Sequence, residues 1–125
     1  MIQIWVLDTS KSKQNCYLST VICHDWGSCW ELKFCPYGAY GEGRAGLLAG
    51  AFNDGNVHVI DVREEWLGSN ETVYVKISEA GWEYSFGEEY STTCMAWRSY
   101  TELLVGGSNG TTFLLGPNHR FRCAL

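Results

Sequence analysis

The sequence has few basic residues and no long apolar run. Its 125 residues contain nine Lys and Arg against fourteen Asp and Glu, which gives a formal net charge of −5. Proteins that bind DNA by themselves use Lys and Arg to displace counterions from phosphates, so this balance argues against a free-standing DNA-binding surface. Charged residues of both signs make up only 18% and hydrophobic residues 46%, which excludes a disordered segment and indicates one modest folded domain.

The sequence also lacks the segments that direct a chain to or through a membrane. Every apolar run is of strand length, and the N-terminal MIQIWVLDTSKSKQ has no basic n-region and no small-residue cleavage site. We therefore expect neither a membrane span nor a secretory signal. Without a secretory route, the six Cys are expected to be reduced thiols rather than a disulfide framework.

Four neighbouring residues, Cys23, His24, Cys29 and Cys35, are of the types that bind zinc, but their spacing is poor. Structural zinc motifs usually bring pairs of ligands together across about two to four residues. If residues 29–35 form one strand, Cys29 and Cys35 lie about 20 Å apart at roughly 3.3 Å per residue. We therefore predict buried thiols, and neither a metal nor a cofactor.

What the sequence does contain is a series of short runs typical of β-strands. No segment shows a convincing apolar stripe with the 3.6-residue period of a helix. Asn53-Asp54-Gly55 and Ser108-Asn109-Gly110 each separate two such runs, and both predict a tight two-residue hairpin with positive φ angles. The predicted strands occupy residues 2–7, 17–23, 29–35, 46–52, 57–62, 72–78, 94–97, 103–107 and 111–115.

These strands recur at a regular spacing. The strand and turn from Leu48 to Gly55 match those from Leu103 to Gly110 at an offset of 55 residues, and the strand at residues 30–34 matches residues 93–97 at an offset of 63. Several short strands per repeat of this length are the signature of a propeller. We predict an all-β, WD40-type β-propeller fragment of two to three blades of antiparallel strands. Residues 1–24 would end one blade, 25–80 form a complete blade and 81–125 form most of a third.

In this scheme, residues 29–35 form the innermost strand of the complete blade. Its bulky side chains would fill the space between neighbouring blades, and the turn after it would end the strand. WD-type blades join a His before this strand to an Asp in the hairpin turn by buried hydrogen bonds, and His24 and Asp54 fit those roles. An arc of three blades leaves open edges, so we expect the chain to be a piece of a longer protein. The predicted blade residues are Trp5, His24, Trp30, Phe34, Pro36, Asp54 and Gly55.

Several residues in the predicted loops are candidates for binding a partner protein. Trp26 is either a binding hot spot or a filler between blades. The loop from Tyr37 to Arg44, which includes Tyr40, is either a second surface or a solvent loop, and Trp66 either covers the blade edge or docks a partner. We find no phosphate-binding loop and no nucleophile with a base, so we expect no enzyme and no small-molecule substrate.

One segment resembles a known family. The stretch DWGSCWELKFCPYG at residues 25–38, RAGLLA at residues 44–49 and NDG at residues 53–55 resemble the WD-repeat subunit of RNA polymerase III transcription factor IIIC. The close match covers residues 24–62, and later strands fit more loosely. The resemblance implies a nuclear, non-enzymatic scaffold in the part of the factor that recognises the internal B-block promoter of transfer-RNA genes.

The resemblance also implies the partners of such a scaffold. They would be other subunits of transcription factor IIIC, especially the large DNA-binding subunit, with DNA contacted mainly indirectly. The alternative is a generic WD40 adaptor for protein–protein interaction in another complex, such as a chromatin or ubiquitin-ligase adaptor. A third class, a small secreted binding domain that uses its Cys, would be excluded by six free thiols.

Overall fold

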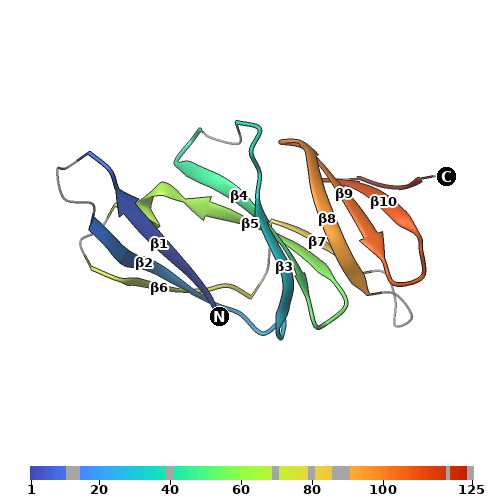
Figure 1. The fold of residues 1–125 in the computed structure, drawn as a ribbon, viewed down its shortest axis with the longest axis horizontal. Helices are drawn as coiled ribbons and strands as arrows, with labels where there is room; N and C mark the ends of the chain where they lie inside the picture. Colours follow the sequence, from blue (N-terminus) through green and yellow to red (C-terminus); the bar gives the residue numbers. More distant parts are fainter. Residues whose placement is uncertain are drawn as a thin grey trace.

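The computed structural model describes residues 1–10, 15–38, 41–68, 71–78, 81–85, 91–117 and 119–123. These residues form three β-sheets that stand side by side, so the prediction of an all-β, propeller-like fragment is confirmed (Figure 1). Among them, no helix has the length and apolar character needed to cross a membrane. The elements are β1 (Ile2–Asp8), β2 (Asn15–Cys23), β3 (Cys29–Phe34), β4 (Arg44–Phe52), β5 (Val57–Arg63), the 3-10 turn η1 (Glu64–Trp66), β6 (Val73–Lys76), β7 (Trp82–Tyr84), β8 (Thr92–Ser99), β9 (Glu102–Gly107), β10 (Thr112–Gly116) and β11 (His119–Cys123).

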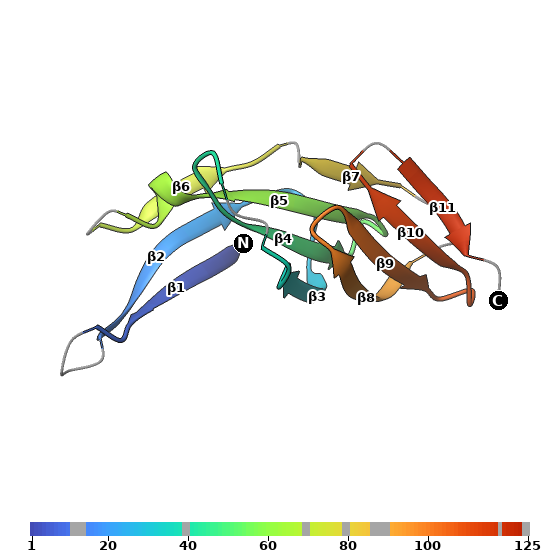
Figure 2. The same ribbon diagram turned by 90° about the horizontal axis from the view of Figure 1, so that it is seen from above.

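The first sheet has the order β1-β2-β6, the middle sheet β3-β4-β5-β7 and the third sheet β8-β9-β10-β11. All neighbouring strands are antiparallel except β2 and β6, which pair in parallel. Seen from above, the sheets follow an arc with β3 and β8 on one side and β6, β7 and β11 on the other (Figure 2).

At β4 and β5 the middle sheet is covered on both faces, which explains the near-continuous apolar runs of these two strands. One apolar cluster joins it to the third sheet, and its members include Ala49, Val59 and Trp97. The other cluster joins it to the first sheet, and its members include Ile22 and Phe52. The middle sheet therefore shares one apolar cluster with each of its two neighbours.

The repeat that the sequence predicts is present in the sheet register. β3 and β8 are the first strands of their sheets, and each carries an irregularity at the matching place, between Cys29 and Glu31 and between Thr92 and Cys94. β1, β5 and β10 occupy the matching place of a third strand. β5 and β10 pair with the outer strands β7 and β11 of their sheets, and β1 pairs in the same way with β2. The offsets of 55 and 63 residues therefore relate equivalent strands.

The two hairpin turns differ from their predicted form. Only the glycines have positive φ, 84° at Gly55 and 81° at Gly110, and the residues before them do not. The N–H of Gly55 bonds to the C=O of Phe52, and the Asp54 carboxylate accepts the N–H of Asn56. A turn followed by one left-handed Gly is the longer hairpin connection, so the prediction of two-residue hairpins is wrong.

The predicted blade boundary at residue 80 is also wrong. β7, placed in the third blade by the prediction, is the fourth strand of the middle sheet. β6, placed in the middle blade, instead extends the first sheet by pairing with residues 20–23 of β2. The chain between β5 and β7 therefore crosses to the neighbouring sheet before it returns, a path that the alternation of apolar residues alone does not reveal.

Candidate interaction surfaces

Trp26 lies inside the protein, so of its two interpretations the structure supports the filler. Only 7% of its surface is exposed. Its ring is stacked against two imidazoles, with centroid distances of 4.0 Å to His58 and 5.0 Å to His24, and Phe52 meets it edge-on at 5.1 Å. These contacts fasten the segment before β3 onto the β4–β5 hairpin.

The predicted bond between His24 and Asp54 is replaced by another pair. His58 Nε2 lies 2.7 Å from Asp54 Oδ2, and its side chain is fully buried. His24 instead accepts the N–H of Trp26 on Nδ1 at 3.2 Å, and burial lowers its pKa from the ordinary value. The sequence signal for the pair Asp54–His58 is its spacing, because residues four positions apart face each other across this hairpin turn.

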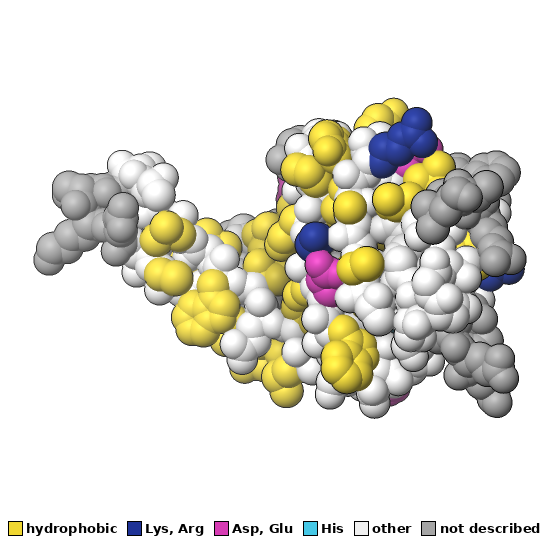
Figure 3. Space-filling model, turned by 45° about the vertical axis from the view of Figure 1, so that its right-hand side comes forward, with side chains coloured by type: hydrophobic (Ala, Val, Ile, Leu, Met, Phe, Trp, Pro, Cys, Tyr) yellow, Lys and Arg dark blue, Asp and Glu magenta, His cyan; other side chains and the backbone are white. Residues whose placement is uncertain are grey.

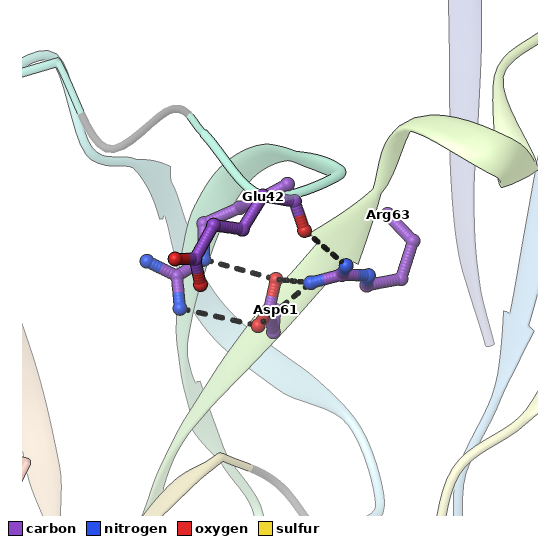
Figure 4. Close-up of polar contacts among 4 residues, drawn as sticks. Glu42, Asp61 and Arg63 are labelled. Atoms are coloured by element: carbon purple, nitrogen blue, oxygen red, sulfur yellow. Dashed lines mark hydrogen bonds and ion pairs between the residues drawn. The ribbon is translucent and has the colours of Figure 1, made fainter.

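Arg44 belongs to a network of charges at the other end of the β4–β5 hairpin (Figure 4). Its Nε and Nη2 donate to the two carboxylate oxygens of Asp61 at 3.0 and 3.2 Å, which raises the pKa of Arg44. Arg63 donates to the same carboxylate at 3.3 Å and to the C=O of Glu42 at 2.6 Å. Arg44 therefore holds the turn in place, and it lines a small polar hollow with Gly41 and Arg63.

The remaining candidate partner residues are placed unevenly. Tyr37 is half exposed beyond the end of β3, where Pro36 follows the strand as predicted, and Tyr40 lies outside the described residues. Trp66 is half-buried against the cluster between the first and middle sheets, and its C=O accepts the hydroxyls of Ser19 and Thr20. Of its two interpretations, the structure supports the one in which Trp66 covers an edge.

The apolar side chains of β3 are exposed, although the sequence predicted that Trp30 and Phe34 pack between two blades. Trp30 is 68% exposed, Leu32 41% and Phe34 52%. They lie on the face of the middle sheet that carries Leu48 and Phe52, which is the face toward the first sheet. In the described part of the chain, the first sheet ends at β1 and leaves these side chains uncovered. Figure 3 shows hydrophobic side chains spread from the first sheet to the centre of the molecule.

Trp5 is likewise exposed, to 56%, whereas the residue 55 positions later, Ile60, is 1% exposed. The two occupy equivalent places in β1 and β5, on the face toward the preceding sheet. Ile60 meets the first sheet there. Trp5 was predicted to complete a blade, and in this structure it forms part of an open flank.

Two charged residues of β3 that the sequence analysis did not single out join the middle sheet to the third. Glu31 accepts the N–H of Met95 at 2.9 Å, and Lys33 donates to the C=O of Met95 at 3.0 Å. The two side chains also form an ion pair with each other at 3.1 Å. In return, Trp97 donates its indole N–H to the C=O of Lys33 at 3.1 Å. We name Glu31 and Lys33 the clamp.

The cysteines whose side chains are described are free thiols, namely Cys16, Cys23, Cys29, Cys35 and Cys94. Of the three considered for zinc, only Cys35 is buried, so the prediction of buried thiols is wrong for Cys29, which is exposed. Within the described part of the chain, no three His, Cys, Asp or Glu side chains are grouped in a way that could hold a metal ion.

Comparison with known proteins gives one informative similarity. No family model matches the chain. The protein described as "Transcription factor tau subunit sfc6" of Schizosaccharomyces pombe is 30% identical over 114 residues, which cover 87% of this chain. The same residues make up 18% of that protein. This chain is therefore similar to part of a transcription factor tau subunit and spans less than a fifth of the length of that protein.

Proposed function

We propose that this chain is part of a non-enzymatic scaffold subunit of transcription factor IIIC, the factor called tau in the name of its relative. The scaffold would act in the nucleus and support B-block promoter recognition and RNA polymerase III transcription of transfer-RNA genes. The observation that carries the proposal is the similarity over 114 residues, which extends well beyond the segment at residues 24–62.

The structure fits a scaffold in two respects. Ionisable side chains such as those of His58, Asp54 and Arg44 are engaged in packing and in hydrogen bonds that hold turns and sheets together. Several exposed residues on β1 and β3 are large and apolar, the kind that proteins cover with other protein segments, namely Trp5, Leu7, Trp30, Leu32 and Phe34. The partners we propose are other subunits of the factor, especially the large DNA-binding subunit, with DNA contacted mainly through it.

The net charge of −5 supports an indirect contact with DNA, because direct binding draws its affinity from Lys and Arg. The alternative, a generic WD40 adaptor in another complex, shares the fold and the exposed surfaces. The similarity to a transcription factor subunit favours the first proposal over this alternative.

The test is to tag the protein in its own cells, crosslink, and identify the proteins and DNA that copurify. Recovery of the other transcription factor IIIC subunits together with transfer-RNA genes is the expected result. Recovery of a different complex, without enrichment of those genes, would support the adaptor and contradict the proposal.

A further inference from the structure

The exposed row on β3 has a buried counterpart in the same chain. At the offset of 63 residues, Leu32 corresponds to Met95 and Phe34 to Trp97, and the matching irregularities in β3 and β8 confirm this register. Met95 is 3% and Trp97 8% exposed. The two rows have the same place in their sheets, so their difference in exposure comes from what lies next to them.

A β-hairpin covers Met95 and Trp97. The hairpin is β3–β4, whose clamp bonds both backbone groups of Met95 and whose residues Cys35, Leu47 and Ala49 share an apolar cluster with Trp97. This hairpin continues into β5 through a short turn, and β4 pairs with β5 over most of its length. The cover over Met95 and Trp97 thus consists of two strands. The first, β3, carries the clamp, and the second, β4, pairs with the edge of β5.

The first sheet offers the same edge without the hairpin. β1 matches β5, and it pairs only with β2, so the edge that corresponds to the place of β4 is open in the described chain. By the matched register, the N–H and C=O of Leu32 face the open side of β3, as those of Met95 face the clamp. A hollow between β1 and β3 is lined by Met1, Ile2, Gln3, Trp30 and Leu32.

We propose that this edge and the row Trp30–Leu32–Phe34 receive an antiparallel β-hairpin whose first strand carries an acidic residue and a Lys or Arg two positions apart. The acid would accept the N–H of Leu32 and the base would donate to its C=O. Apolar side chains on the same face of the hairpin as the acid and the base would cover Leu32 and Phe34, and the second strand would pair with β1. An unpaired edge beside an apolar face is the arrangement that adds strands from other segments.

The hairpin belongs to the same polypeptide, outside residues 1–125. This statement rests on the proposed function, because the matched relative is more than five times the length that the similarity covers. A tethered hairpin avoids most of the entropy cost of association. A second copy of this chain fits poorly, because its own clamp is already bonded to its own Met95. The exposed face of its β8 has Cys94 and Ala96 at the clamp positions.

The experiment supplies a hairpin of known sequence. A second copy of residues 28–56 is added directly before Ile2, so that the turn Asn53–Asn56 joins it to β1 as it joins β4 to β5. The added copy carries Leu32→Val, which distinguishes its peptides by mass. The matched control carries, in the added copy only, Glu31→Ala and Lys33→Ala.

Hydrogen exchange of the original Leu32 amide is the readout. We expect it to slow by about tenfold or more in the fusion and by clearly less in the alanine control. A free peptide of residues 28–53, titrated against the unaltered chain, gives a second measurement if the fusion folds poorly. Unchanged exchange in a folded fusion, with no shift of the Leu32 amide resonance by the peptide, would overturn the proposal.

Sedimentation of the unaltered chain tests the other possible occupant, which is a second copy of the chain. A dimer in which the Leu32 amide is protected would show that a second copy fills the site, and would overturn the assignment to the same polypeptide. None of these measurements involves the transcription factor. The hairpin site can therefore fail while the proposed function stands, and the copurification experiment can fail while the site stands.

Discussion

β3 and β8 are the first strands of their sheets, but their equivalent apolar side chains differ in exposure. On β8, the side chains toward the preceding sheet are buried under the β3–β4 hairpin. On β3, the equivalent side chains are open to solvent. The same register and the same kind of side chain thus give a core in one place and a surface in the other. A repeated strand acquires its environment from its neighbour, and its own sequence does not determine whether it is buried.

The largest expected effect tests this comparison at one pair of equivalent positions. Trp97→Ala removes a buried ring and its hydrogen bond to Lys33, so we expect the free energy of unfolding to fall by about 3–5 kcal/mol. Phe34→Ala removes a half-exposed ring, and we expect a loss below about 1 kcal/mol. Urea unfolding followed by circular dichroism measures both, and equal losses would contradict the comparison.

The next effect concerns the clamp. Glu31→Ala leaves the N–H of Met95 without its acceptor, which we expect to cost about 1–2 kcal/mol of unfolding free energy. Lys33→Ala should cost less, about 0.5 kcal/mol, because its side chain is 47% exposed. Hydrogen exchange of the Met95 amide should quicken more in the first variant. Glu31→Gln, which keeps an acceptor oxygen, serves as the control and should exchange at an intermediate rate.

A smaller effect should appear when the pH is changed. We expect the stability of the middle sheet to depend on pH more than that of the third sheet. The cluster around Trp26 contains His24, whose pKa burial lowers from 6.5, whereas the third sheet has Phe113 and Asn109 at the places of His58 and Asp54. A lowered folded-state pKa means that the unfolded chain binds the proton more readily. The stability from neutral His24 is therefore complete above about pH 6.5 and declines as the pH falls toward the folded-state pKa.

The measurement is hydrogen exchange of β4 and β5 amides against those of β9 and β10 at pH 7.5 and at pH 5.5, corrected for intrinsic rates. We expect the corrected protection of β4 and β5 to drop more on acidification. His24→Phe keeps the ring contacts with Trp26 and Phe52 but cannot be protonated, so it should reduce the difference. An unchanged difference in this variant would assign the pH dependence to other groups.

We expect the smallest effect when the clamp residues are introduced on the exposed face of β8, where no backbone lies beside them in the described chain. Cys94→Glu together with Ala96→Lys places an acid and a base on β8 at the clamp positions, on a face that is exposed in this structure. We expect the free energy of unfolding to change by less than about 0.5 kcal/mol, because surface substitutions that gain no partner have little effect. A clear stabilisation in thermal unfolding would show that the pair acts within its own strand.

The sequence predicts the repeat and most strands because both depend on local patterns. Alternating apolar residues placed β1, β5 and β10, and the Gly at residues 55 and 110 marked the turns. The features that the sequence does not predict depend on which of several sheet edges a strand pairs with. The pattern of residues 73–76 indicates a strand, but nothing in it selects β2 over the middle sheet as its partner. The pairing of Asp54 with His58 rather than His24 is likewise decided by the geometry of the hairpin.

The clamp shows the same limit at the level of the candidate site. Glu31 and Lys33 are ordinary polar residues of an alternating strand, and their role appears only when the backbone of Met95 lies beside them, 62 to 64 residues away in sequence. The exposure of Trp30 was mispredicted for a related reason, since a bulky aromatic in a strand predicts burial only if a neighbour is there to cover it.

The crossing of β6 has a consequence for how this protein can be divided. By sequence, β6 lies within the middle repeat, while by pairing it is the edge of the first sheet, where the N–H of Ile77 also bonds to the C=O of Cys23. A cut at the sequence period would remove β6 from one edge of β2, which would keep only β1 as its partner, and would leave β6 without a sheet. The repeats resemble one another in shape, yet neither of the first two is a module that can be exchanged, deleted or transplanted without the other.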